Sequence, residues 1–500
     1  MGITSIRLFA GSAGLAAVLA ATFAYQAAAS TASPSPKHGQ AAAPAAAPKA
    51  DGSYVFPAIG TITPYRAKGQ VKGVALFLSG DGGWNLGVVD MARAMAERGV
   101  TVAGISTPAF QKALEHGQKD CINPNYALTE LAQDFEHRMG LPRYVKPILI
   151  GYSSGATMAY SALAQAPAGV YRASVSLGFG PDIGGKKPWC PIPGVTVTRI
   201  TKPESGWLFS AAPRLSAPWI VLQGLADQVV SPETTRAFTA HIPQAELIEL
   251  PKVGHGFSVQ ANWMPQFTQA VDKLFAQPRQ AALQGPAPSS ALSATDDLPL
   301  TEVTDPHAPR SRTMAVLYSG DGGWAGLDRD LAARLAAHGV PVVGVDSLQY
   351  FWTARSPRGA AADAARIIAS YSQKWNRPRV LLLGYSFGAD NLPYIVGSLP
   401  AAQQRQLARV SMLGLSPTAD FQFHLASWLD VGGDRSMPTV PQLSRLRGLP
   451  LQCIRGTDEH RSACLALPAG LADQVVMPGG HHFGGNADLL ASAILKGLAT

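Results

Sequence analysis

The sequence has few charged residues and no clusters of them. Asp, Glu, Lys and Arg together make up 15% of its 500 residues, and the net charge is a modest +8. Lys and Arg are scattered, without the basic runs that bind a phosphate backbone. We therefore expect no nucleic acid as a partner. The mild positive balance fits peripheral contact with an anionic membrane surface better.

Long apolar runs are also scarce. Beyond the N-terminal stretch Leu8–Ala24, no segment has about 18 unbroken apolar residues, so no further membrane span is expected. Arg7 precedes that stretch, and Ala27–Ala29 is a small-residue site of the kind that signal peptidase cuts. The pattern predicts a signal peptide over residues 1–29, cleaved near Ala29, and export of the chain. An uncleaved anchor is the alternative.

Cysteine is rare. The four cysteines form no C-x-x-C pair, and their spacing suggests no metal site. Cys121 and Cys190 lie in the first half of the chain, and Cys453 and Cys464 lie in the second. In an exported chain this distribution predicts one disulfide in each half. Four free cysteines are the alternative.

What the sequence does contain is a duplication. The hexapeptide Ser-Gly-Asp-Gly-Gly-Trp occurs at Ser79–Trp84 and again at Ser319–Trp324. Each copy is followed at a similar distance by Gly-Tyr-Ser-x-Gly, at Gly151–Gly155 and Gly384–Gly388. The period is far too long for a solenoid unit, so one domain is present twice.

Segments rich in Ala, Pro and Ser set the domain boundaries. Residues 30–50 have almost no large apolar side chain and predict a disordered tether. A second proline-rich segment, residues 277–311, predicts a linker. The expected domains are therefore 51–276 and 312–500.

Within each half, short β-rich runs alternate with longer amphipathic stretches, which indicates a mostly parallel sheet covered by helices on both faces. The predicted fold class is α/β, with two tandem domains that each contain a mostly parallel sheet flanked by helices. The expected strands are Val74–Leu78, Val100–Ile105, Pro147–Gly151, Trp219–Gln223 and Glu246–Leu250 in the first half, and Met314–Tyr318, Val340–Val345, Val380–Leu383, Leu451–Arg455 and Gln474–Met477 in the second.

The pentapeptides have the context of a nucleophile elbow. The apolar run Leu381–Leu383 leads into Gly384-Tyr385-Ser386-Phe387-Gly388, and a helix can begin just after it. Such a turn holds a serine exposed above the sheet. Ser386 is the expected nucleophile of the second half, and Ser153 is its counterpart in the first.

A reactive serine needs a histidine base and an acid, in the chain order Ser, acid, His for this fold. After Ser386, Asp458 follows one predicted strand and His481 follows the next. The first half offers Asp227 and His255, so Ser153, Asp227 and His255 form a second candidate triad. Gly-His-x-Phe in both halves favours His481 over its neighbour His482.

Two backbone N–H groups are needed to stabilise the oxyanion. One is expected from Phe387, directly after the nucleophile, and the other from Asp321 in the glycine-rich hexapeptide. The counterparts in the first half are Ser154 and Asp81.

Together, these motifs resemble the AcvB/VirJ family of bacterial virulence-associated periplasmic proteins, in its two-repeat form. The resemblance is most specific from Ser319 onward, including Gly-Tyr-Ser-Phe-Gly-Ala-Asp at Gly384–Asp390. It implies two tandem α/β-hydrolase domains, and a periplasmic hydrolase that cleaves the aminoacyl ester of lysyl- or alanyl-phosphatidylglycerol in the outer leaflet of the inner membrane. By motif, the second half carries the activity through Ser386, Asp458 and His481.

Several side chains fit such a substrate. Asp390 and Asp321 are acids near the expected site, and Asp390 is the nearest candidate to bind the amine. Tyr350 and Trp352 follow a predicted strand and are expected at acyl chains or the lipid interface, and Arg355 is expected to pair with phosphate. Structural roles are the alternative for each.

No metal or organic cofactor is implied. Two other classes of function stay open. One is a different serine esterase or lipase, and the other is a non-catalytic periplasmic binding protein associated with virulence or secretion.

Overall fold

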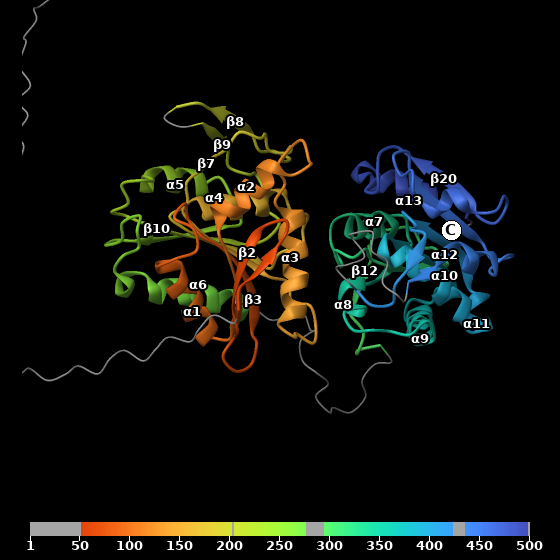
Figure 1. Cartoon of the computed structure of the whole chain (residues 1–500). Coiled ribbons are helices and arrows are strands. Elements are labelled where there is room, and N and C mark those ends of the chain that lie inside the picture. The colour runs from red at the N-terminus through yellow and green to blue at the C-terminus, as the bar shows by residue number, and fades with distance from the viewer. Residues whose placement is uncertain (1–51, 203–204, 277–294, 424–435, 499–500) are drawn as a thin grey trace, which may run out of the picture. The chain divides into compact units, whose positions relative to one another are not determined.

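Two mixed, mainly parallel sheets form the framework of the chain (Figure 1). The computed structural model describes residues 52–202, 205–276, 295–423 and 436–498. The predicted signal peptide, the tether and the first part of the predicted linker lie outside the described residues. Among the helices that are described, none is long and apolar enough to cross a membrane.

The first sheet has the strand order β1-β2-β4-β3-β5-β6-β10-β11. Its first three strands pair antiparallel, and all later pairs are parallel. In chain order the strands are β1 (Tyr54–Phe56), β2 (Gly60–Tyr65), β3 (Gly73–Leu78), β4 (Val100–Ile105), β5 (Ile148–Tyr152), β6 (Ala173–Leu177), β10 (Trp219–Gly224) and β11 (Ala245–Leu250). An inserted three-stranded sheet contains β7 (Asp182–Gly184), β8 (Val197–Ile200) and β9 (Gly206–Phe209).

Helices cover both faces of this sheet, which is why β3, β4, β6 and β10 are buried at every position. On one face α1 and α6 pack together, and on the other α3 and α4 pack against the remaining core residues (Figure 1). The helices are α1 (Gly87–Glu97), α2 (Thr107–His116), α3 (Asn125–Arg138), α4 (Ser154–Gln165), α5 (Pro232–Thr239) and α6 (Met264–Ala276), with a short turn η1 (Gln260–Asn262).

The second sheet repeats the plan, in the order β12-β14-β13-β15-β16-β19-β20. Only the β12–β14 pair is antiparallel. The strands are β12 (Leu300–Val303), β13 (Thr313–Tyr318), β14 (Val342–Val345), β15 (Arg379–Tyr385), β16 (Leu407–Leu413), β19 (Leu451–Gly456) and β20 (Asp473–Met477); β17 (Thr418–Ala419) and β18 (Met437–Pro438) form a separate pair.

Helices α7 and α13 lie on one face of the second sheet, and α9, α10 and α12 lie on the other. The described helices here are α7 (Gly326–Ala337), α8 (Ser347–Tyr350), α9 (Pro357–Trp375), α10 (Phe387–Ser398), α11 (Ala401–Gln404), α12 (Thr439–Ser444) and α13 (Ala487–Leu495), with the turns η3 (Ala463–Ala466) and η4 (Phe483–Gly485). The α/β-hydrolase plan predicted for both halves is therefore present.

One predicted boundary needs correction. Leu300–Val303 lies inside the predicted linker, yet it pairs along its whole length with β14 and closes the edge of the second sheet. The sheet of the second repeat therefore begins before residue 312. The four residues Leu300–Val303 are too few, and too mixed in polarity, to be recognised as a strand among the prolines around them.

Both predicted disulfides are confirmed. Cys121 is bonded to Cys190, and Cys453 is bonded to Cys464. The first bond ties the inserted segment to the segment before α3. The second joins β19 to η3 and closes a short loop at the carboxyl end of the sheet.

Candidate functional site

The candidate nucleophile lies in a strained turn between β15 and α10. Ser386 has φ 51° and ψ −121°, a conformation that non-glycine residues rarely adopt. A Cβ at Gly384 would lie 2.6 Å from the backbone of Gly388, and one at Gly388 would lie 2.4 Å from the carbonyl oxygen of Tyr318. Only glycine fits either position, so the turn needs both glycines of the pentapeptide.

Ser386 and His481 are within hydrogen-bonding distance. Ser386 Oγ lies 2.8 Å from Nε2 of His481, and Nδ1 of the same ring lies 2.6 Å from Oε1 of Glu459. The three side chains come from loops after β15, β19 and β20, which end at the same edge of the sheet. The arrangement is the Ser–His–acid catalytic triad of a serine hydrolase, and each such set of three residues is called a relay below.

The prediction that Asp458 orients His481 is wrong, because Glu459 takes that place. Asp458 accepts a hydrogen bond from the Thr457 hydroxyl instead, 3.1 Å away. The first repeat contains the signal that identifies the acid. Asp227 is the third residue after Gly224, the last residue of β10, just as Glu459 is the third after Gly456, the last residue of β19.

The relay shifts the protonation equilibria of both partners. Burial lowers the pKa of His481, but the hydrogen bond and the charge of Glu459 outweigh burial and raise this pKa above its usual value. Burial raises the pKa of Glu459, and the hydrogen bonds from His481 and the Gly456 N–H outweigh burial, so the net shift is downward. Glu459 therefore stays ionised and favours the imidazolium that forms when the base takes a proton.

The neighbouring His482 has a different environment. Its Nδ1 lies 2.6 Å from the Tyr385 hydroxyl, and burial together with the charge of His481 lowers the pKa of His482. The choice of His481 as the ring that faces the serine is confirmed by the geometry.

A glycine makes room for His481. Gly414, directly after β16, has φ +68°, and a Cβ there would lie 2.7 Å from Cε1 of the His481 ring. Its counterpart Gly178, after β6, would place a Cβ 3.3 Å from the same atom of His255. Neither glycine was singled out in the sequence, since neither belongs to a recognised motif.

We expect Gly414→Ala to lower the second-repeat kcat/KM by about 10²-fold, because the methyl group displaces His481 from the serine. The matched variant Gly178→Ala should leave Ser386-dependent turnover unchanged. Ester hydrolysis and the melting temperature of both variants check this. Full activity of a folded Gly414→Ala protein would show that His481 tolerates the displacement.

The hexapeptide loop passes beside the elbow. A Cβ at Gly320 would lie 3.6 Å from Cβ of Ser386 and 3.2 Å from the Tyr385 ring. Ser319 anchors the loop, because its hydroxyl accepts the Ser347 N–H at 2.9 Å. Asp321 lies at the tip, half-buried.

Phe387 is the first residue of α10, where backbone N–H groups have no acceptor within the helix. Asp321 follows Gly320, which lies beside Ser386, and Phe387 directly follows Ser386, so both positions suit the oxyanion donors expected from the sequence.

The tryptophan of the hexapeptide has a structural role. The Trp324 ring lies on β14, where a Cβ at Gly344 would come within 2.1 Å of it, and Trp84 packs on Gly104 of β4 in the same way. This contact fixes the loop to the neighbouring strand in both repeats.

Asp390 lies one helical turn after the serine, on α10. It is 8% exposed, and its Oδ1 accepts the Ser416 N–H at 2.7 Å. Burial raises the pKa of Asp390 to about 8, although the hydrogen bonds from Ser416 and the charge of His481 act in the opposite direction. Asp390 and Asp321 both raise the pKa of His481, after the larger contributions of burial and Glu459, so both are electrostatically close to the relay.

Two further acids near the site were missed in the sequence. Asp328, in the first turn of α7, is 4% exposed, and its Oδ2 lies 3.4 Å from the Gly320 N–H. Asp346, directly after β14, is 6% exposed and caps α8 through the Gln349 N–H. Burial raises the pKa of Asp328 well above its usual value, and nearby Asp346 and Asp321 raise it further. Neither residue belongs to a motif.

The predicted contact of Tyr350 and Trp352 with substrate or lipid is wrong. Tyr350 is 1% exposed, and its hydroxyl donates to Oδ2 of Asp363 at 2.6 Å. Trp352 is 3% exposed, and its indole N–H donates to the carbonyl of Leu141 at 2.8 Å. Both rings are core residues because polar partners distant in sequence allow them to be buried.

Arg355 also has an internal role. Its guanidinium lies 4.6 Å from the Tyr350 ring centroid and donates to the Tyr350 carbonyl at 3.1 Å. The structure therefore gives it a stabilising contact with the end of α8, and does not bring it to the relay.

The first repeat assembles its own relay. Ser153 Oγ lies 2.9 Å from Nε2 of His255, and Nδ1 of His255 lies 2.8 Å from Oδ2 of Asp227. Ser153 has φ 54° and ψ −123°, nearly the same strained turn as Ser386. All three residues predicted as a second triad are therefore in contact.

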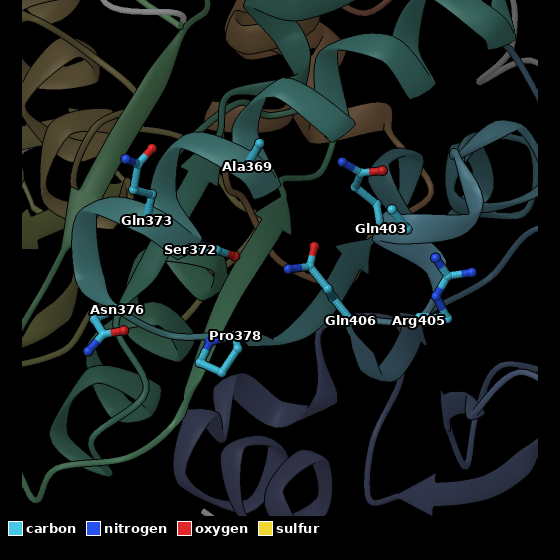
Figure 2. Close-up of a pocket in the computed structure, with 9 residues that line it drawn as sticks. Ala369, Ser372, Gln373, Asn376, Pro378, Gln403, Arg405 and Gln406 are labelled. Carbon is cyan, nitrogen blue, oxygen red and sulfur yellow. The ribbon is translucent and has the colours of Figure 1, made fainter.

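The hollow drawn in detail lies away from the relay. Figure 2 shows it between the end of α9, near Asn376 and Pro378, and the segment Gln403–Gln406. These residues precede β15 and β16, so the hollow lies at the amino ends of the strands, opposite the relay. Within the described ranges, no group of three metal-ligating side chains occurs.

One family of known proteins matches most of the chain. The sequence profile of a family described as bacterial virulence protein (VirJ) matches residues 72–177 and 312–500. Among curated proteins, none matches the chain significantly.

Among solved structures, the chain is similar to α/β serine hydrolases and to an esterase, each over less than half of its length. A homologue from Coxiella burnetii is 16% identical over 45% of this chain and 96% of its own, with a TM-score of 0.30. A thermophilic esterase from Thermogutta terrifontis is 15% identical over 47% and 97%, with a TM-score of 0.32. A lidless hydrolase from Xanthomonas campestris is 18% identical over 45% and 95%, with a TM-score of 0.30.

Proposed function

The chain belongs to the VirJ family of bacterial virulence proteins, and on that basis we propose that its second repeat is a periplasmic serine hydrolase of aminoacyl-phosphatidylglycerol. The proposed substrate is the lysyl or alanyl ester, which is cleaved to the free amino acid and phosphatidylglycerol. The observation that carries the proposal is a complete Ser386–His481–Glu459 relay with additional carboxylates beside it.

The relay supplies the chemistry of ester cleavage. Ser386 Oγ attacks the ester carbonyl carbon while Nε2 of His481 takes the hydroxyl proton, and Glu459 stabilises the imidazolium. Phosphatidylglycerol leaves with that proton, and the aminoacyl group stays on Ser386. Water then attacks the aminoacyl-serine with His481 as base, which releases the amino acid and restores the serine.

The carboxylates favour a cationic substrate. In an aminoacyl ester the α-amine is one carbon away from the reacting carbonyl, so an acid that reads it must lie close to the serine. Asp390 is one turn from Ser386 on α10, and Asp321 is in the loop that passes beside it. Burial keeps Asp390 largely protonated at neutral pH, and a bound ammonium group favours its ionised form.

Asp390→Asn tests this reading of the amine. Because a charge-assisted hydrogen bond contributes about 1.5–3 kcal/mol, we expect kcat/KM for lysyl-phosphatidylglycerol to fall roughly ten- to a hundredfold. Turnover of a neutral p-nitrophenyl ester should change far less. The assay is best made in a Ser153→Ala protein, so that only the second repeat is measured. Equal losses on both substrates would mean that Asp390 holds the site together and does not read the amine.

The pH profile gives a second readout. For the lysyl ester, kcat/KM should keep rising up to about pH 8 as Asp390 loses its proton, and should fall above that pH as the α-amine, with an ordinary pKa of about 7.7–8.0, loses its charge. In Asp390→Asn this upper rise should disappear, leaving only the rise that belongs to His481.

The direct test of the function is chemical. Purified protein incubated with vesicles that contain lysyl-phosphatidylglycerol should release lysine and phosphatidylglycerol, and a deletion strain should accumulate the aminoacyl lipid.

A fluorophosphonate probe separates an enzyme from a non-catalytic binding protein, and a panel of lipid esters separates this activity from that of a general esterase or lipase. N-terminal sequencing of the periplasmic protein tests export and cleavage near Ala29.

A further inference from the structure

The relay of the first repeat is as complete as that of the second. Asp227 is wholly buried on its side chain and accepts the N–H groups of Val229 and Val230 at 2.8 and 3.0 Å, besides its contact with His255. The acid is therefore held rigidly behind the base.

The surroundings of the serine are also retained. A Cβ at Gly80 would lie 3.2 Å from Cβ of Ser153, so the first hexapeptide passes beside the elbow as the second one does. The Ser79 hydroxyl accepts the Thr107 N–H and anchors that loop, and Ser154 begins α4. The elements needed to bind an oxyanion are in place.

The two sites differ in their acidic side chains. Three buried acids of the second site have neutral counterparts in the first: Val88 for Asp328, Ser106 for Asp346 and Thr157 for Asp390. The last pair shows the correspondence most clearly. The Thr157 hydroxyl donates to the Gly180 carbonyl, and the Asp390 carboxylate accepts the N–H of Ser416, which holds the same place after its strand.

The loops that surround the two relays, here called the rims, differ as well. Four apolar side chains of the first repeat that stand well exposed belong to loops at the carboxyl ends of β3, β10 and β11, where the relay lies. They are Leu86 (83% exposed), Leu225 (40%), Val229 (71%) and Val259 (58%). By chain position relative to the two relays, the corresponding residues of the second repeat are Gly326, Thr457, Arg461 and Gly485. An apolar rim without the three acids suits an uncharged acyl group.

We propose that the first repeat is a second, independent esterase site that hydrolyses neutral esters with an apolar acyl chain. Ser153 Oγ attacks the ester carbonyl carbon, and Nε2 of His255 takes the hydroxyl proton and passes it to the departing alcohol. Water then attacks the acyl-serine, its proton goes through His255 back to Ser153, and the carboxylic acid leaves. Water is the only co-reactant.

The test uses four full-length proteins: the wild type, Ser153→Ala, Ser386→Ala and the double variant. With p-nitrophenyl butyrate, Ser386→Ala should keep most of the wild-type turnover. The turnover of the double variant should be lower than that of the wild type by a factor on the order of 10³ or more. A fluorophosphonate should label the peptide that carries Ser153 in the Ser386→Ala protein. Absence of both turnover and label in that protein, with its melting temperature unchanged, would overturn the proposal.

The choice of substrate is tested separately, in the Ser386→Ala background. We expect kcat/KM to rise from acetate to hexanoate p-nitrophenyl esters by up to about fourfold for each methylene buried. Leu86→Gly combined with Val229→Arg gives the first rim two residues of the second, and the ratio of hexanoate to acetate kcat/KM should fall towards one. A preference for a lysine ester over butyrate at Ser153 would refute the assignment of a neutral substrate.

Discussion

Ser386→Ala should abolish hydrolysis of aminoacyl-phosphatidylglycerol, with a loss on the order of 10⁶ in kcat. The serine oxygen is the atom that forms the covalent bond, and it lies 2.8 Å from the base that activates it. Removing it leaves only substrate binding and the oxyanion donors. The assay is release of lysine from lysyl-phosphatidylglycerol vesicles, with circular dichroism and the melting temperature as evidence of folding.

The matched control for that loss is Ser153→Ala, which has the same change in the same kind of turn. It should leave aminoacyl-lipid hydrolysis nearly unchanged, because the acids that suit an amine lie around Ser386. If Ser153→Ala removed the activity and Ser386→Ala kept more than about a tenth of it, the aminoacyl-lipid hydrolase would be the first repeat.

The second large effect concerns the acid. Glu459→Gln keeps the size of the side chain but removes the charge that orients His481, and we expect kcat to fall by about 10⁴. The acid limb of the pH profile should also move to lower pH. Glu459 is what raises the pKa of His481 against the opposing effect of burial, so without its charge the histidine loses its proton more readily.

Asp458→Asn is the control here, since the two acids are adjacent in the chain. Its side chain contacts Thr457 and not the histidine, so kcat and the acid limb should stay as in the wild type. The opposite pattern, with a large loss at Asp458 and none at Glu459, would show that the loop rearranges in the working enzyme.

The parts of the fold and of the site that could be predicted from the sequence are those that follow from local sequence patterns. The elbows at Ser153 and Ser386 follow from glycines whose spacing has a steric cause, and both histidines follow from their place after a strand. The predicted acid, Asp458, is one residue away from the observed one, Glu459. A loop has no regular side-chain periodicity that would show which of two adjacent residues faces the histidine. Comparing the distances to Gly224 and Gly456 between the repeats would have identified Glu459.

The remaining errors concern contacts between distant parts of the chain. Tyr350 and Trp352 resemble interface aromatics until Asp363 and Leu141 provide partners that allow burial. Strand β6 was not predicted, because serines interrupt its apolar residues; in the fold Ser176 is buried and accepts the indole N–H of Trp219. Likewise, burial of Asp390 and the contrast between the two rims become visible only once the sheets are formed.

The backbone at the two serines has a consequence for the balance between stability and activity. Ser153 and Ser386 both hold positive φ angles with ψ near −120°, and such a conformation costs on the order of 1–3 kcal/mol in a residue with a side chain. Glycine would adopt the same turn with little of that cost. At these two positions the catalytic serine is therefore less favourable for the stability of the fold than an inert glycine. A chain selected for stability alone would drift towards glycine at both.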